Sequence, residues 1–229
     1  MILRLRSGLR TEPSIVARAL WLHHSCQLVL RRLGFGIRVD GQPPRNGLIA
    51  SNHLSYLDIL FYGATVPCVF VAKREVRAWP LLGLLAALGG TVFIDRQSAT
   101  SAAKAAARLE VMLAEGVMVL VFPEGTSSDG AEVLRFHTSL FEPSVKVGSP
   151  VTAAAVGYSA GAGAEERDLC YYGEISFAPH LLETLQLPEV AATLHFAARG
   201  QLYSDRKQAA KLTREAVVGL RSFRFSSVD

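Results

Sequence analysis

Short apolar runs alternate with longer stretches of helical periodicity along most of the chain. Uninterrupted apolar segments are typical of buried strands, whereas apolar residues spaced three and four apart are typical of helices with one buried face. The apolar runs predict strands at residues 36–40, 47–51, 68–72, 91–94, 117–122, 150–156, 171–177 and 190–197. The periodic stretches predict helices at residues 56–64, 79–88, 98–115, 138–147, 179–186 and 205–222. This alternation predicts an α/β fold in which helices flank a mixed, mostly parallel sheet.

The length of the chain limits the number of domains. A chain of 229 residues can bury one extensive core and is too short for two full domains. We therefore predict one main domain over residues 36–229, preceded by an N-terminal extension over residues 1–35. A turn-rich segment at residues 41–47 follows the first predicted strand.

The composition is apolar for a freely soluble protein, because half of the residues are hydrophobic and the mean hydropathy is +0.26. Even so, no apolar stretch reaches the roughly 20 residues that a membrane-spanning helix needs. The best candidate, residues 80–94, is interrupted by Gly89 and Gly90. No secretory signal sequence is recognised either. These features predict a protein that is exposed to the cytosol.

The positive charge is concentrated in the N-terminal part of the chain. Residues 1–45 contain eight arginines against Glu12 and Asp40, a net charge of +6, and the rest of the chain carries −2. Within this part, residues 14–33 predict an apolar helix that contains Trp21 and two arginines near its end. Such a helix suits the surface of a membrane, but it also suits packing on the domain with solvated arginines. A nucleic-acid surface is not favoured, because no basic stripe with interleaved aromatic residues continues into the body of the chain.

The cysteines and histidines form no metal-binding pattern. Cys26, Cys68 and Cys170 are far apart and include no C-x-x-C pair, which argues against a disulfide framework or a zinc site. We expect three reduced, buried thiols. The histidines outside the segments discussed next have no partners at metal-ligand spacing, so no metal is predicted.

Reactive polar residues follow two of the predicted strands directly. The segment 52–58, Asn-His-Leu-Ser-Tyr-Leu-Asp, comes after the strand at 47–51. The segment 122–126, Phe-Pro-Glu-Gly-Thr, comes at the end of the strand at 117–122. Open α/β sheets place their ligand crevices at the carboxyl ends of the strands. The two segments are therefore expected to meet in one site.

The spacing of His53 and Asp58 restricts how the two side chains can meet. Five positions along a regular helix rotate a side chain by about 140°, so the two meet only if His53 precedes the helix and Asp58 lies in its first turns. The carboxylate would then accept from one imidazole nitrogen and leave the other as a base. No nucleophilic residue accompanies the pair, which makes a substrate hydroxyl a candidate nucleophile. The ordinary alternative is a buried histidine next to a helix-capping carboxylate.

The second segment offers groups that can bind a polar substrate. Gly125 permits a tight turn, and the amides of such a turn can receive an oxyanion or a phosphate. Glu124 could anchor a polar acceptor, and a structural ion pair with Arg96 is the alternative.

Together these segments resemble the motifs of the glycerolipid acyltransferase family, which includes the lysophosphatidate acyltransferases. Residues 52–58 match its first motif, residues 90–96 its second and residues 122–126 its third, and residues 147–151 are a weak version of its fourth. Order and spacing agree from about residue 36 to residue 156. The resemblance implies the acyltransferase fold and identifies residues 36–229 as the acyltransferase domain.

The resemblance also implies a mechanism. His53, supported by Asp58, would deprotonate an acceptor hydroxyl, which attacks the thioester of acyl-CoA or acyl carrier protein without a cofactor or a covalent enzyme intermediate. Residues near the acceptor head group would be Arg96, Glu124, Gly125 and Thr126, and we assign amides around Gly125 and Thr126 to the oxyanion site. Further candidate substrate-binding residues are Asn52, Ser55, Lys73, Ser127 and Arg135. The implied enzyme is a peripheral protein that acts on membrane lipids at the cytoplasmic face of the cell membrane.

The residue after the third motif leaves the acceptor lipid open. The family commonly has an arginine there, which would bind phosphate through its planar fork, but this chain has Ser127. The run that follows resembles the lyso-ornithine lipid branch, whose acceptor carries no phosphate. Arg96 and Arg135 remain available to a phosphate, so lysophosphatidate and lyso-ornithine lipid both stay open as acceptors.

Three other interpretations compete with this one. Residues 157–161 fit the G-x-S-x-G pattern of serine hydrolases, but a nucleophile elbow needs a helix directly after Ser159, and a loop rich in glycine and alanine is predicted there. The pair of His53 and Asp58 could instead activate water in a lipid or thioester hydrolase. The last alternative is a non-catalytic lipid-binding protein.

Overall fold

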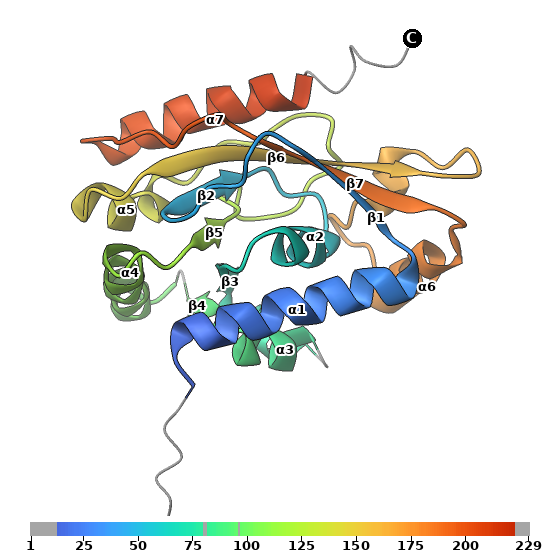
Figure 1. The fold of residues 1–229 in the computed structure, drawn as a ribbon, viewed down its shortest axis with the longest axis horizontal. Helices are drawn as coiled ribbons and strands as arrows, with labels where there is room; N and C mark the ends of the chain where they lie inside the picture. The colour runs from blue at the N-terminus through green and yellow to red at the C-terminus, as the bar shows by residue number, and fades with distance from the viewer. Residues whose placement is uncertain (1–12, 80–81, 96, 223–229) are drawn as a thin grey trace, which may run out of the picture.

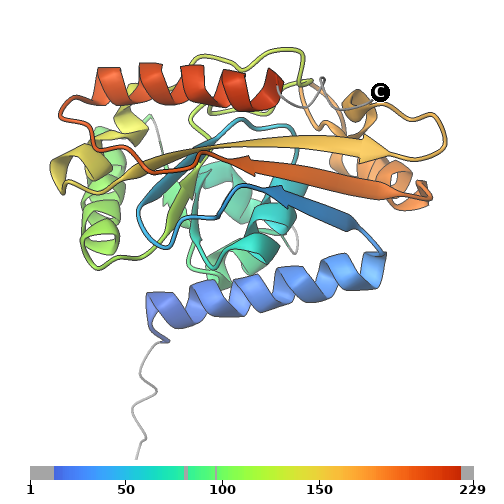
Figure 2. The same cartoon turned by 45° about the horizontal axis from the view of Figure 1, so that its top comes forward.

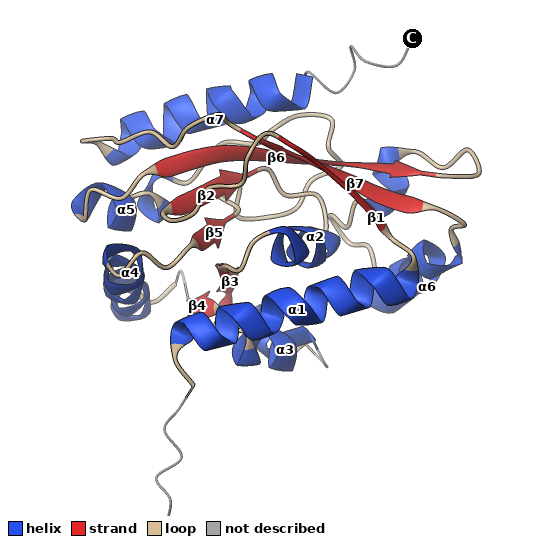
Figure 3. Ribbon diagram, viewed as in Figure 1, coloured by secondary structure: helices blue, strands red, loops and turns tan. Residues whose placement is uncertain are grey.

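The computed structural model describes residues 13–79, 82–95 and 97–222 (Figure 1). The strands are β1 (Gly36–Asp40), β2 (Leu48–Ser51), β3 (Val69–Lys73), β4 (Val92–Ile94), β5 (Val119–Val121), β6 (Val151–Ala160) and β7 (Val190–Phe196). The α-helices are α1 (Ile15–Leu33), α2 (Leu57–Thr65), α3 (Leu82–Leu88), α4 (Ala99–Ala114), α5 (Glu142–Lys146), α6 (Phe177–Gln186) and α7 (Arg206–Ser222). Short 3-10 helices are η1 (Arg74–Ala78), η2 (Thr138–Leu140) and η3 (Glu166–Leu169). Helices and strands alternate along most of the chain, as the apolar pattern predicted (Figure 3).

The strands form one sheet in the order β1-β7-β6-β2-β5-β3-β4. Neighbouring strands are parallel except β6 and β7, which run antiparallel. In the middle of the sheet, β2 pairs with β5 and β6, so that Ile49 lies opposite Leu120 and Ser51 lies opposite Ala154. The predicted mixed, mostly parallel sheet is confirmed.

Helices cover both faces of the sheet. One face packs against α1 and α2 through alternate strand residues such as Ile49 and Leu120. The other face packs against α4 and α7 through the intervening residues, such as Leu48 and Val119. Figure 1 and Figure 2 show α7 on one side of the sheet and α1 and α2 on the other. Because both faces are buried, the central strands contain the continuous apolar runs by which they were recognised.

The strand predicted at residues 171–177 is wrong. The chain turns at Gly173, which has a φ of 59°, and α6 already begins at Phe177. The apolar side chains of this segment pack in a ring cluster instead of a sheet: Tyr171 lies edge-on against Phe177, with ring centroids 6.3 Å apart. The apolar run at residues 171–177 predicts a strand because it is rich in aromatic residues, but these residues pack against one another and not in a sheet.

The helix predicted at residues 138–147 is broken into η2 and α5. Pro143 lies at the start of α5, where its missing amide costs no helical hydrogen bond. After α5, Gly148 adopts a φ of 62°, a left-handed conformation that ends a helix readily. Proline and glycine thus restrict α5 to a short helix.

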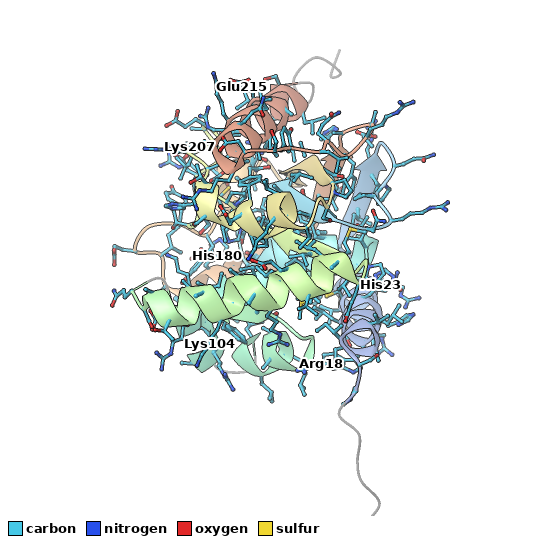
Figure 4. The ribbon with its side chains drawn as sticks, turned by 90° about the vertical axis from the view of Figure 1, so that its left-hand side faces the viewer. Arg18, His23, Lys104, His180, Lys207 and Glu215 are labelled. Atoms are coloured by element: carbon cyan, nitrogen blue, oxygen red, sulfur yellow. The ribbon has the colours of Figure 1, made fainter. Side chains whose placement is uncertain are left out.

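The N-terminal helix α1 packs on the domain and also exposes apolar side chains. Its buried residues Leu22 and Cys26 belong to the same core cluster as α2. Arg18 donates to the carbonyl oxygens of Ala87 and Leu88 at the end of α3, and Figure 4 shows Arg18 beside that helix. The exposed apolar side chains of α1 are those of Val16, Leu20, Trp21, Leu28, Val29 and Leu33. The helix α1 therefore packs on the domain through one face and exposes apolar side chains on another.

Candidate active site

The site begins with the turn between β2 and α2. β2 ends at Ser51, His53 lies in the turn, and Asp58 is the second residue of α2. This arrangement brings the imidazole Nδ1 of His53 to 2.7 Å from Oδ2 of Asp58. The geometry is the one that the five-residue spacing requires.

The carboxylate of Asp58 is fully buried and is surrounded by hydrogen-bond donors. Besides His53, its Oδ2 accepts from the backbone amides of Leu54 at 2.8 Å and Ser55 at 3.2 Å. Its Oδ1 accepts from the hydroxyl of Tyr158. A buried carboxylate loses its hydration, and only such donors compensate for that loss. Asp58 is therefore held in one orientation behind the imidazole.

His53 is more accessible than its partner, since 21% of its side-chain surface is exposed. Its ring stacks on the ring of Phe122, with centroids 4.1 Å apart and planes inclined by 12°. With Nδ1 committed to Asp58, the nitrogen that remains for a substrate is Nε2. A histidine held in this way can act as a general base.

Glu124 follows β5 and is 5% exposed. Among the described residues, no well-aligned hydrogen bond reaches either of its carboxylate oxygens, although the backbone amides of His53 and Leu134 lie close enough to influence its pKa. Burial raises the pKa of Glu124 to about 8, although the backbone amide of His53 opposes the rise, and the nearby charge of Asp58 adds to it. The carboxyl group is therefore mainly protonated at neutral pH. The predicted partner Arg96 lies outside the described residues.

The turn that follows Glu124 is tied to the first segment. Gly125 has a φ of 74°, and its amide donates to the carbonyl of Phe122 at 3.1 Å. That amide is already engaged in the turn, and the oxyanion site expected at the amides around Gly125 and Thr126 stays a prediction. Thr126 is exposed beside it, and the amide of Ser128 donates to the carbonyl of His53 at 3.0 Å.

Three of the further candidate residues have buried or internal roles. The side chain of Asn52 is buried and exchanges two hydrogen bonds with the backbone of Val156, at 3.0 and 2.9 Å. Ser55 is fully buried, and the hydroxyl of Ser127 donates to the carbonyl of Tyr171. Asn52 and Ser127 thereby fix the loops around the site, whereas the hydroxyl of Ser55 has no hydrogen-bond partner among the described residues. A substrate-binding role for these three residues stays a prediction.

The two remaining cationic candidates are exposed. Lys73 lies at the end of β3, and Arg135 lies in the loop between β5 and η2. Their contact with a substrate stays a prediction.

The G-x-S-x-G pattern does not form a nucleophile elbow. Ser159 lies inside β6, is exposed, and pairs with Ala191 of β7. After β6 the chain enters a turn, so no helix supports a strained serine. The structure does not support the serine hydrolase interpretation.

The cysteines do not supply a nucleophile either. Cys26, Cys68 and Cys170 are free and buried, as expected. Burial raises the pKa of Cys26 and of Cys170 to about 12, which keeps these thiols protonated and unreactive at neutral pH.

The sequence did not reveal three residues that support the site, of which Tyr158 contacts Asp58 directly and the other two hold the backbone next to it. These are Tyr158, Glu166 and Arg221. Arg221 is 9% exposed and donates to Glu166 from both terminal nitrogens, at 3.2 Å each. Tyr158 is the variable residue of the G-x-S-x-G pattern at residues 157–161, a pattern that assigns it no role, and Glu166 and Arg221 belong to no motif. The separation of the three residues in sequence leaves no periodic signal. The one available hint was a tyrosine in an otherwise apolar strand.

The fold and the site together define an α/β enzyme with a histidine and aspartate pair at the carboxyl end of a central strand. Comparison with known proteins identifies the class. The sequence model of the family described as Acyltransferase matches residues 37–157. The chain therefore belongs to the acyltransferase family.

Curated relatives agree with this assignment. A lyso-ornithine lipid O-acyltransferase from Pseudomonas aeruginosa is 33% identical over 202 residues, which cover 88% of this chain and 75% of the relative. The enzyme of the same name from Rhizobium meliloti is 33% identical over 208 residues, covering 84% and 70%. A 1-acyl-sn-glycerol-3-phosphate acyltransferase from Neisseria meningitidis is 37% identical over 134 residues, covering 57% and 52%.

A solved structure shows the same fold. The crystal structure of the 1-acyl-sn-glycerophosphate (LPA) acyltransferase PlsC from Thermotoga maritima matches with a TM-score of 0.69. The match covers 96% of this chain and 86% of that chain at 21% identity. The predicted acyltransferase fold is confirmed.

Proposed function

We propose that the protein transfers a fatty acyl group from an acyl thioester to the hydroxyl of a lysolipid during membrane lipid biosynthesis. The observation that carries this proposal is the 2.7 Å contact between His53 and the buried carboxylate of Asp58. Among the described residues, no serine, threonine or cysteine side chain is hydrogen-bonded to the imidazole, so the pair provides a base without a paired nucleophile of the enzyme. A reaction whose nucleophile is a substrate hydroxyl needs that combination.

The proposed step conserves atoms and charge. Nε2 of His53 takes the proton of the acceptor hydroxyl while its oxygen attacks the thioester carbonyl, and Asp58 stabilises the imidazolium that forms. The tetrahedral intermediate collapses with cleavage of the C–S bond. The leaving thiolate, whose parent thiol has a pKa near 8.5, takes the proton from His53. The products are an ester and a free thiol, and the step needs no cofactor.

The donor is acyl-CoA or acyl carrier protein, because either presents the same thioester. For the acceptor we favour lyso-ornithine lipid over lysophosphatidate. Matches to lyso-ornithine lipid O-acyltransferases extend over 88% and 84% of the chain, against 57% for the Neisseria meningitidis relative. Ser127, which replaces the arginine common in the family, also removes a phosphate ligand.

A matched assay tests donor and acceptor together. The purified protein is offered lyso-ornithine lipid or lysophosphatidate, each with acyl-CoA and with acyl carrier protein, and both the lipid product and the free fatty acid are measured. Faster acylation of lyso-ornithine lipid supports the preferred acceptor. Faster acylation of lysophosphatidate replaces it, and release of fatty acid without acceptor consumption identifies a hydrolase.

We also propose that the protein binds the cytoplasmic face of the membrane peripherally through α1. The helix exposes Trp21 and Leu28 on the surface that does not pack on the domain, with Arg31 and Arg32 in its last turn. Apolar side chains flanked by arginines favour the interface between head groups and acyl chains. In the ranges that the structure describes, no helix combines the length and apolarity needed to cross a bilayer.

A further inference from the structure

The strand β6 extends beyond its neighbour β2 and therefore has a free edge beside the active site. β2 ends at Ser51, opposite Ala154, whereas β6 continues to Ala160. Backbone groups on this edge have no strand to pair with, and buried backbone groups without partners are costly. Side chains from distant parts of the chain take the place of the missing strand.

Three side chains complete this edge. Asn52 bonds both the amide and the carbonyl of Val156. Arg221, at the end of α7, donates to the same carbonyl at 2.7 Å and to the carbonyl of Gly130 at 2.7 Å. Glu166 accepts from the amide of Tyr158 at 2.8 Å and pairs with Arg221. The backbone at Tyr158 is thereby linked to a partly buried ion pair.

The side chain of Tyr158 connects this edge to the catalytic pair. It is almost completely buried, and its hydroxyl donates to Oδ1 of Asp58, the oxygen that His53 does not contact. Burial raises the pKa of Tyr158 well above its ordinary value, and the charge of Asp58 raises it further. The phenol therefore stays protonated and remains a donor.

We infer that Tyr158, whose backbone is held by the partly buried ion pair of Arg221 and Glu166, is a positioning residue that keeps the carboxylate of Asp58 oriented toward His53. Donors on both carboxylate oxygens prevent rotation of the group about its bond to Cβ. Without the donor on Oδ1, only the donors on Oδ2 remain, so the plane of the carboxylate is less restricted and the imidazole is held less firmly. This inference rests on the proposed function, because it assigns Tyr158 a role in the same transfer reaction.

Tyr62 offers a matched control. Like Tyr158 it is fully buried in the same core cluster, and its hydroxyl also has one partner, Ser51 Oγ at 2.6 Å. Removing either hydroxyl takes one buried hydrogen bond from the protein. Only the hydroxyl of Tyr158 contacts the catalytic pair.

The experiment compares Tyr158→Phe, Tyr62→Phe and His53→Ala with the wild-type protein, using the donor and acceptor that the wild type accepts. We expect Tyr158→Phe to lower kcat by roughly 10- to 100-fold, the factor that corresponds to the loss of one buried hydrogen bond to a charged group, with KM for both substrates within about twofold. Tyr62→Phe should keep kcat within about twofold. Melting temperatures show whether the two tyrosine variants lose stability to a similar extent.

The possible results separate the two hypotheses. If His53→Ala is inactive and Tyr158→Phe keeps the kcat of Tyr62→Phe, the positioning role is wrong and the proposed function stands. If His53→Ala transfers acyl groups normally, the proposed mechanism is wrong and the positioning role with it. Should Tyr158→Phe fail to fold, the double variant Arg221→Met and Glu166→Gln is tested instead. It removes the ion pair that holds the backbone of Tyr158 and leaves neither charge without its partner. A wild-type kcat in a folded double variant overturns the inference.

Discussion

The imidazole of His53 lies flat against the ring of Phe122, with the ring centroids 4.1 Å apart. The two residues come from different segments of the chain, one following β2 and the other following β5, and these strands are neighbours in the sheet. The stack therefore joins the histidine segment to the segment that contains Glu124. It also restricts rotation of the imidazole, which keeps Nδ1 directed at Asp58.

Replacing Phe122 by leucine tests the contribution of this stack. We expect Phe122→Leu to lower kcat by roughly 10- to 100-fold, because a misplacement of the base by about 1 Å can cost 10²-fold. Phe70→Leu is the control, since Phe70 is buried and stacks on Phe122 without being in ring contact with His53. Both variants should lose similar stability in thermal unfolding. Equal kcat values for the two would show that the stack has no catalytic part.

Replacing the catalytic pair tests the mechanism. His53→Ala and Asp58→Asn should each lower acyl transfer by roughly 10²- to 10⁴-fold, the range expected when a general base or its partner is lost. Circular dichroism checks that the variants are folded. Ser159→Ala is the control and should keep full activity, because Ser159 is exposed in β6. Normal transfer by either pair variant contradicts the mechanism.

The buried carboxyl of Glu124 predicts a pH-dependent stability. Its pKa is raised from 4.5 to about 8 by burial, so between these values the folded protein holds a proton that the unfolded chain has released. The free energy of unfolding therefore falls as the pH rises from about 5 to 8, by on the order of a few kcal/mol from this group. The variant Glu124→Gln has no ionisable group at this position. Its free energy of unfolding should therefore increase relative to that of the wild type as the pH rises.

Urea unfolding at pH 5 and pH 8 measures this difference. The free energy of unfolding of Glu124→Gln minus that of the wild type should be larger at pH 8 than at pH 5. A difference that is the same at both pH values would show that Glu124 ionises normally in the folded protein.

The apolar surface of α1 predicts how the protein binds membranes. Trp21 is 42% exposed, and Trp21→Glu should weaken sedimentation with liposomes containing anionic lipid by several-fold, because a charge resists burial among acyl chains. Val111→Glu is the control. Val111 is 57% exposed but belongs to α4 on the other face of the sheet. Equal binding by the two variants would argue against docking through α1.

Local patterns were sufficient for much of the fold and for the centre of the site. The apolar runs at β2 and β5 are strong signals because both faces of a parallel sheet are buried. The spacing of His53 and Asp58 allowed one geometry, a turn followed by the first residues of a helix, and that geometry is present. Local patterns failed at residues 171–177, where aromatic side chains pack in a cluster and the strand pattern has no partner strand.

By itself, the sequence determined the alternation of strands and helices, the position of the two reactive segments at strand ends, and the resemblance to the acyltransferase family. Only the tertiary structure decided which groups support the pair of His53 and Asp58. Tyr158 reaches Asp58 across a hundred residues, and Arg221 completes the free edge of β6. Such contacts depend on which backbone and carboxylate groups remain without partners once the sheet has formed. No periodic pattern in the sequence predicts these contacts, because they arise from packing between elements that are distant in sequence.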